Sequence, residues 1–162
     1  MRADRQASEV PKVANLGNVR PPLVFLASIV AGLAIHLAWP VRVVPTELSV
    51  PLGAATTTVA IALFLAAVRS FRRAGTPIPG NRPTTAVVCT GPYRYSRNPI
   101  YLSFCLLQLG IALWVNDIWL LVTLIAAVLL MSLVVIPREE AFLEARFPSE
   151  YLPYKGSVRR WL

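Results

Sequence analysis

The sequence predicts an all-α, polytopic membrane protein with about four transmembrane helices, the last two of which form a helical hairpin. The chain of 162 residues is 56% hydrophobic and only 15% charged, whereas soluble domains carry about 25% charged residues. Its apolar residues are gathered in runs close to the ~20 residues that a helix needs to cross a bilayer. Its basic residues, apart from Arg42, lie on one predicted side of the membrane. This composition excludes an ordinary soluble domain.

The first two predicted spans occupy residues 22–39 and 50–68. Residues 22–39 contain no formal charge and end at Trp39, which is followed by the helix breaker Pro40. No cleavage site with small residues closes this run, so we do not expect a signal peptide. Residues 50–68 are apolar apart from three threonines, and Arg69 closes them.

The third and fourth predicted spans, residues 100–115 and 118–136, are separated only by the polar pair Asn116 and Asp117. A polar pair inside a long apolar stretch is typical of a tight helical hairpin. The first arm is short for a full span, so we expect it to tilt little or to be extended by residues before Ile100.

The basic residues predict the orientation of the chain. The segment 69–99 contains six arginines and no acid, which by the positive-inside rule makes it cytoplasmic. The tail 1–20, expected to be flexible, and the segment 138–162 then lie on the same side, so both termini are predicted to be cytoplasmic. Anionic lipid of the inner leaflet accounts for the net charge of +8, and no nucleic-acid partner is needed.

Residues 74–99 form a loop with five prolines and three glycines. A loop of this length between membrane helices is usually functional or disordered, and its aromatic and aliphatic residues favour order. Asn98 is expected to cap the next helix, with Pro99 at the first helical position. The run Tyr93–Arg97 has two interpretations, an anchor at the lipid headgroups or part of a site.

The segment 138–162 begins with a predicted short amphipathic helix that Pro148 ends. Glu139 and Glu140 directly follow a span on the inner side, where anionic lipid should repel them. They either pair with arginines of the loop and complement the positive helix N-terminus, or they accept hydrogen bonds from a bound polar ligand.

Isolated polar residues add little to the prediction of function. His36 is an ionisable residue inside a span, and we expect an interfacial or helix-packing role because it lies near the outer end. Gln108 either lines a substrate tunnel or bonds between helices. The spacing of Cys89 and Cys105 fits neither a disulfide framework nor a metal site, so both are predicted to be unpaired and no metal is expected.

Two motifs carry a family resemblance: TGPYRYSRNPIY at residues 90–101 and REEAFLEARFPSEYLPY at residues 138–154, with the hairpin between them. Together they resemble the integral membrane methyltransferases of the isoprenylcysteine carboxyl methyltransferase type, which are related to the phospholipid methyltransferases. The resemblance covers about residues 74–160. It implies a single membrane methyltransferase domain over residues 21–162 that uses S-adenosyl-L-methionine, with residues 74–99 as the cofactor loop.

The resemblance also implies which residues bind the cofactor. They are Thr85, Ala86, Val87, Val88, Tyr93, Arg97, Asn98, Pro99, Ile100, Tyr101, Glu139 and Glu140. Two positions depart from the family pattern. Asn98 replaces a histidine and cannot titrate near neutral pH. Val135 replaces an arginine that is thought to hold a substrate carboxylate, which weakens the case for a prenylcysteine acceptor.

The expected activity is methyl transfer to a lipophilic or membrane-embedded acceptor, through a carboxylate, thiol or amine, with no catalytic residue assigned. The acceptor would enter from the bilayer, and membrane lipids would be the other partners. The predicted location is a bacterial inner membrane, and the oligomeric state is left open. The alternative is a non-catalytic membrane protein that keeps the fold as a ligand-binding or partner subunit.

Overall fold

The computed structural model describes residues 20–78 and 84–162, and every regular element in this part of the chain is helical. The predicted flexible tail lies outside the described residues apart from Arg20. The long helices are α2 (Pro21–Ala38), α3 (Thr46–Arg73), α4 (Pro99–Val115) and α5 (Ile118–Leu130). The shorter elements are the 3-10 helix η1 (Gly91–Arg94), the π-helix η2 (Met131–Val135), α6 (Ile136–Arg146) and α7 (Pro148–Ser157).

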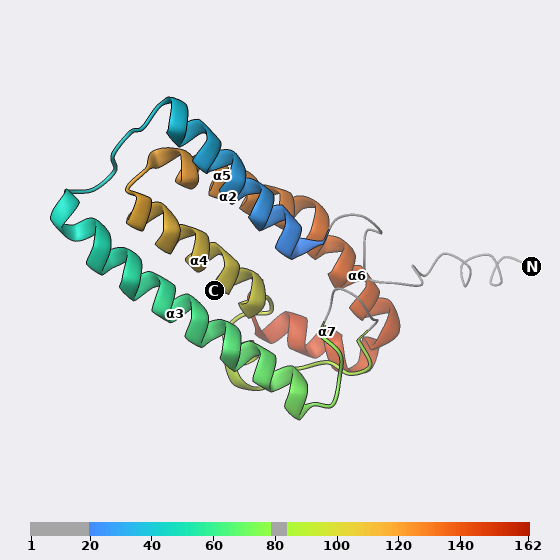
Figure 1. Cartoon of the computed structure of the whole chain (residues 1–162). Coiled ribbons are helices and arrows are strands. Elements are labelled where there is room, and N and C mark those ends of the chain that lie inside the picture. Colours follow the sequence, from blue (N-terminus) through green and yellow to red (C-terminus); the bar gives the residue numbers. More distant parts are fainter. Residues whose placement is uncertain (1–19, 79–83) are drawn as a thin grey trace, which may run out of the picture.

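The helices form an antiparallel bundle in which α4 packs against α2, α3 and α5 (Figure 1). Three helical stretches are long and apolar enough to cross a membrane: Pro21–Ala38, Thr46–Arg73 and Ile118–Arg146. The apolar helix α4 has 17 residues, or about 25 Å at 1.5 Å per residue, which agrees with a short first arm of the hairpin. The chain is therefore an all-helical, apolar bundle of the kind that resides in a membrane.

The turn between α4 and α5 lies at Asn116 and Asp117, as the sequence predicts. Asn116 has a φ of 57°, the left-handed conformation in which helices commonly end and which asparagine tolerates. Asp117 is the N-cap of α5, and its carboxylate accepts a 2.8 Å hydrogen bond from the Trp119 N–H. The polar pair therefore supplies both the end of one helix and the start of the next.

The same two side chains also hold the link between α2 and α3, and we call these contacts the turn clamp. Asn116 Oδ1 accepts from the backbone N–H groups of Val43 and Val44 at 3.0 and 2.9 Å. Asp117 Oδ2 accepts from the Val41 N–H at 3.0 Å and lies 2.8 Å from His36 Nδ1. His36 thus has the helix-packing role expected for it.

Helix α5 continues into α6 through the π-helix η2, without the separation that the sequence predicts at Ile136 and Pro137. The Ile136 N–H donates to Met131 O, five residues back, as π geometry requires. This wider turn accommodates Pro137, which has no N–H of its own. The helix ends at Arg146, just before Pro148, where the sequence predicts an end. Helix α7 follows and was not predicted.

Small residues bring α3 and α4 together near the turn clamp. A Cβ built on Gly53 would lie 2.9 Å from Trp114 N, and one built on Gly110 would lie 3.0 Å from Thr57 N. Glycine at both positions therefore allows close approach of the two backbones. Farther along α3, Ala60, Ala67 and Phe71 are also buried.

Candidate functional site

A pocket lies where the end of α3, the start of α4 and helices α6 and α7 meet, at the opposite end of the bundle from the turn clamp. Four tyrosines contribute to its wall, and we call it the tyrosine pocket. Its empty space, which includes open solvent at the mouth, is about 680 Å³. The lining residues are Phe71, Thr84, Ala86, Val87, Val88, Tyr93, Arg97, Asn98, Ile100, Tyr101, Glu139, Glu140, Leu143, Tyr151 and Tyr154.

The structure brings together, in this one pocket, all the cofactor-binding residues expected from the sequence except two. Thr85 is exposed, and its N–H donates to Thr76 Oγ1 at 2.9 Å, so it fastens the loop to the end of α3. Its neighbour Thr84 lines the pocket instead. Pro99 is buried at the first position of α4, outside the lining. Residues 79–83 of the predicted loop lie outside the described part of the chain.

Glu139 is the carboxylate that faces Tyr101. The Tyr101 hydroxyl donates to Glu139 Oε1 at 2.6 Å, within the ordinary range of an O–H···O hydrogen bond. No Lys, Arg or His of residues 20–78 and 84–162 forms an ion pair with Glu139. A carboxylate inside a pocket without a cationic partner is ready to accept a hydrogen bond or a positive charge from a ligand.

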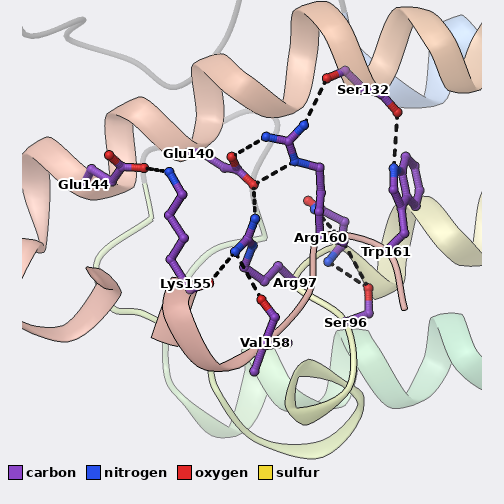
Figure 2. A network of polar contacts seen from close by, with 10 residues as sticks. Ser96, Arg97, Ser132, Glu140, Glu144, Lys155, Val158, Arg160 and Trp161 are labelled. Atoms are coloured by element: carbon purple, nitrogen blue, oxygen red, sulfur yellow. Dashed lines mark hydrogen bonds and ion pairs between the residues drawn. The ribbon is translucent and has the colours of Figure 1, made fainter. Parts of the chain in front are cut away.

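Glu140, the next residue, is fully engaged by two arginines (Figure 2). Arg97 Nη2 donates to its Oε1 at 2.8 Å, and Arg160 donates to both oxygens, at 3.1 Å from Nε and 2.7 Å from Nη2. The interpretation that a glutamate here pairs with an arginine of the loop therefore holds for Glu140. Arg160 is a further partner that was not predicted.

Arg97 and Asn98 also bind the chain after α7. Arg97 Nη1 donates to the carbonyls of Lys155 and Val158 at 2.7 and 3.1 Å. Asn98 occupies the N-cap position of α4, but its side chain does not cap the helix, because Nδ2 donates to Arg160 O at 3.0 Å. The residues just before α4 thus link the pocket to the segment that follows α7.

The motif around Tyr93 splits between the pocket and the surface. Tyr93 is buried and packs edge-on against Phe71 with ring centroids 5.3 Å apart, while Tyr95 is 75% exposed. The Tyr154 hydroxyl donates to Tyr93 O at 2.7 Å. Burial raises the pKa of Tyr93, Tyr151 and Tyr154 above the ordinary tyrosine value, so all three hydroxyls stay protonated at neutral pH.

Five lining residues were not predicted: Phe71, Thr84, Leu143, Tyr151 and Tyr154. Tyr151 and Tyr154 stand in the motif at residues 138–154, where their spacing of three puts them on one face of a helix. That pattern could have indicated them. Phe71 and Leu143 belong to apolar or amphipathic stretches and carry no signal that separates a pocket wall from a core.

Other residues singled out from the sequence lie away from the pocket lining. Val135 is 3% exposed and packs in a core cluster with Tyr101 and Ile136. Gln108 is fully buried, and it accepts from the Ser28 hydroxyl at 2.6 Å, which is the bond between helices that one interpretation expects. Both cysteines are free. In the described part of the chain, no group of His, Cys, Asp and Glu could hold a metal ion.

The apolar bundle is that of an integral membrane protein, and it has a pocket at one end of its helices. Residues 48–150, more than half of the chain, match the profile of the phospholipid methyltransferase family, and the chain belongs to that family. This family membership confirms the recognition made from the two motifs and implies methyltransferase activity in general.

One curated relative is an uncharacterised protein of Haemophilus influenzae. It is 40% identical over 63 residues, which are 39% of this chain and 100% of that protein. No solved structure matches the chain significantly.

Proposed function

We propose that this protein transfers a methyl group from S-adenosyl-L-methionine to a lipophilic acceptor held in the membrane. The observation that carries the proposal is Glu139, a carboxylate in the tyrosine pocket that accepts a hydrogen bond from Tyr101 and has no cationic partner among the described residues. The cofactor bears a sulfonium and an ammonium group, and either positive charge complements this carboxylate. Membership of the phospholipid methyltransferase family supports the reaction class.

The remaining wall also fits such a cofactor. Residues 86–88 lie outside regular secondary structure, and among the described residues their backbone groups form no backbone–backbone hydrogen bond, so they can bind polar parts of a ligand. Phe71 and Tyr93 offer aromatic faces, against which an adenine ring can stack. Within the described residues, the pocket therefore combines a carboxylate that has no cationic partner, irregular backbone and aromatic surface.

A groove between α3 and α4 supports a lipophilic acceptor. It is lined by Ala60, Ile61, Phe64, Ser103, Phe104 and Leu107, and its empty space, open solvent included, is about 400 Å³. The three α3 residues lie two to three helical turns before Phe71, and the three α4 residues lie one to two turns after Ile100, so the α3–α4 groove runs along the same helix pair that ends at the pocket. Ile61 is 52% exposed, and in a membrane that exposure is to lipid. We propose that the acceptor's hydrocarbon chain enters here from the bilayer.

Methyl transfer requires mainly that the protein position the two reactants. When bound, the cofactor supplies an activated methyl group, whose transfer to a nucleophile disperses charge. The protein's residues need to orient the two reactants and keep water away. A carboxylate or thiolate acceptor needs no general base, whereas a protonated amine needs one. We leave these three acceptor groups as alternatives and assign no catalytic residue.

We further propose that the tyrosine pocket faces the cytoplasm of a bacterial cell and that the protein resides in the inner membrane. The segment 69–99, which contains six arginines and no acid, supports this orientation, because basic residues are retained on the cytoplasmic side. The soluble cofactor would then reach the pocket directly from the cytoplasm.

Calorimetry with S-adenosylhomocysteine on the detergent-solubilised protein tests the cofactor site. We expect wild type to bind and Glu139→Gln to lose affinity about tenfold or more, because the substitution keeps the shape and removes the charge. Glu144→Gln is the matched control, since Glu144 lies on the same helix but pairs with Lys155 outside the pocket. Absence of binding in wild type would reject the proposal.

A second experiment tests catalysis. Wild-type protein, labelled S-adenosyl-L-methionine and a native lipid extract should give a labelled lipid-soluble product, and its structure identifies the acceptor. Binding without any transfer to the extract would favour the alternative of a non-catalytic subunit that retains the fold.

A further inference from the structure

We propose that Arg160 is a positioning residue of the tyrosine pocket: it fixes the rotation of α6, and so the direction of Glu139, by holding Glu140 and the π-turn η2 together. This inference rests on the proposed function, because it takes Glu139 to be the ligand-facing group. Arg160 itself does not line the pocket.

The first contact is the pair of hydrogen bonds that the Arg160 guanidinium donates to the two carboxylate oxygens of Glu140. A shorter or more flexible side chain cannot make both bonds at once. Glu140 is 7% exposed in its side chain and Arg97 is 10% exposed, so this carboxylate is shielded from water and depends on its two guanidinium partners. Successive residues of a helix point about 100° apart. Pinning Glu140 on one side therefore directs Glu139 to the face where Tyr101 lies.

The second contact is to the π-turn. Ile136 N–H donates to Met131 O, so the Ser132 carbonyl would next receive the N–H of residue 137. That residue is Pro137, which has none. Arg160 Nη1 donates to this carbonyl at 3.3 Å, and Trp161 Nε1 donates to Ser132 Oγ at 3.2 Å. Arg160 thus supplies a donor that the helix itself lacks.

The backbone of the same segment completes the link to α4 (Figure 2). We call residues Val158–Trp161 the post-α7 segment. The carbonyls of Arg159 and Arg160 accept hydrogen bonds from Arg97 N and Asn98 Nδ2, both at 3.0 Å. The segment therefore bridges the start of α4, the π-turn and α6, and the two helices that it joins carry Tyr101 and Glu139.

The test compares Arg160→Gln, Arg160→Lys and a control, Arg146→Gln, in the full-length solubilised protein. Arg146 lies on the exposed surface of α6, outside the pocket, and makes no ion pair among the described residues. Its substitution by glutamine therefore removes the same charge from the protein as Arg160→Gln does. We expect Arg160→Gln to weaken S-adenosylhomocysteine binding about tenfold, Arg160→Lys to recover part of that loss, and Arg146→Gln to bind like wild type.

A split in the kinetics separates positioning from catalysis. Because Arg160 does not touch the reacting atoms, Arg160→Gln should raise the KM for S-adenosyl-L-methionine about tenfold while kcat at saturating cofactor stays within about threefold of wild type. Equal binding by Arg160→Gln and wild type would overturn the proposal, as would an equal loss in Arg146→Gln.

Hydrogen exchange of the ligand-free protein makes the test independent of cofactor binding. We expect faster amide exchange over residues 138–143 in Arg160→Gln and Arg160→Lys than in wild type, and no change in Arg146→Gln. If Arg160→Gln does not fold, Arg160→Lys is compared alone, and unchanged exchange and affinity there would overturn the proposal. If wild type binds no S-adenosylhomocysteine, the proposed function fails, and unchanged exchange would separately reject the role of Arg160.

Discussion

The Tyr101 hydroxyl donates a 2.6 Å hydrogen bond to Glu139 Oε1 and thereby joins the first turn of α4 to α6. Tyr101 is 7% exposed, so removing its hydroxyl leaves the carboxylate without its protein partner in a shielded place. For Tyr101→Phe we expect a loss of about 1–3 kcal/mol in the free energy of unfolding and weaker binding of S-adenosylhomocysteine. Thermal unfolding in detergent and calorimetry measure the two effects.

The control for that variant is Tyr95→Phe, which removes the same hydroxyl from an exposed side chain of the neighbouring turn. It should leave stability and binding unchanged. If Tyr101→Phe binds S-adenosylhomocysteine as tightly as wild type, the hydrogen bond does not prepare Glu139 for a ligand.

Asp117 makes several of the polar contacts around the turn clamp. It is completely buried and accepts from two backbone N–H groups besides facing His36. Asp117→Ala removes a helix cap and the acceptor of the partly buried Val41 and Trp119 N–H groups, so we expect a loss of about 2–4 kcal/mol of unfolding free energy. Glu47→Ala, at an exposed acid near the same end of the bundle, should change stability little. Binding by the folded fraction of Asp117→Ala should equal wild type, because the pocket is at the other end.

The close approach of α3 and α4 predicts a penalty for any side chain at Gly110. A Cβ there would collide with Thr57 Oγ1 and lie 3.0 Å from Thr57 N. Gly110→Ala should therefore destabilise the protein by about 1–3 kcal/mol. Gly156→Ala is the contrasting variant: nothing lies within 4 Å of its Cβ, and alanine in a helix should be neutral or stabilising by up to about 1 kcal/mol. The unfolding midpoints of both variants measure these two changes in stability.

Substitutions of Gln108 test whether this side chain packs between helices or lines a substrate tunnel. Its amide donates to Leu120 O at 3.2 Å, and the Ser28 hydroxyl that it contacts also donates to Phe25 O at 2.8 Å. Gln108→Leu keeps the volume and leaves Ser28 with a partner, so we expect a stability change of about 1 kcal/mol or less and unchanged methyl transfer. Gln108→Ala should cost about 2–5 kcal/mol through the cavity that it opens. Loss of transfer in the folded leucine variant would instead support a tunnel.

The long helices of the fold could be predicted because a helix that crosses lipid needs a long apolar run. Prolines, tryptophans and charged residues mark the ends of these runs. The polar pair at Asn116 and Asp117 was visible for the same reason. Its partners at Val41, Val43 and Val44 were not, because those bonds use backbone groups, which every residue carries. The continuity of α5 and α6 was also hidden, since a π-turn that accommodates Pro137 leaves no composition signal.

The site shows a similar division. The family resemblance identifies most of the pocket wall, but it implies Thr85 where the structure has Thr84, because a loop without periodicity does not indicate which neighbour points inward. The resemblance matches Glu139 to the cofactor-binding glutamate and sets Glu140 beside it, but it does not indicate what makes the surroundings of the two side chains different. The difference between these two lies in Arg160, twenty residues away along the chain, and no local pattern connects them.

One end of the bundle is anchored by the turn clamp and by the glycine-lined crossing of α3 and α4. The α3–α4 groove is lined by other residues of the same helix pair. Under the proposed function, the residues that anchor the two helices therefore differ from those that would contact the acceptor. A change in groove side chains such as Ile61 or Leu107 would then alter which hydrocarbon chain is accommodated without loosening the anchoring end, so such a scaffold would be suited to evolve new acceptors.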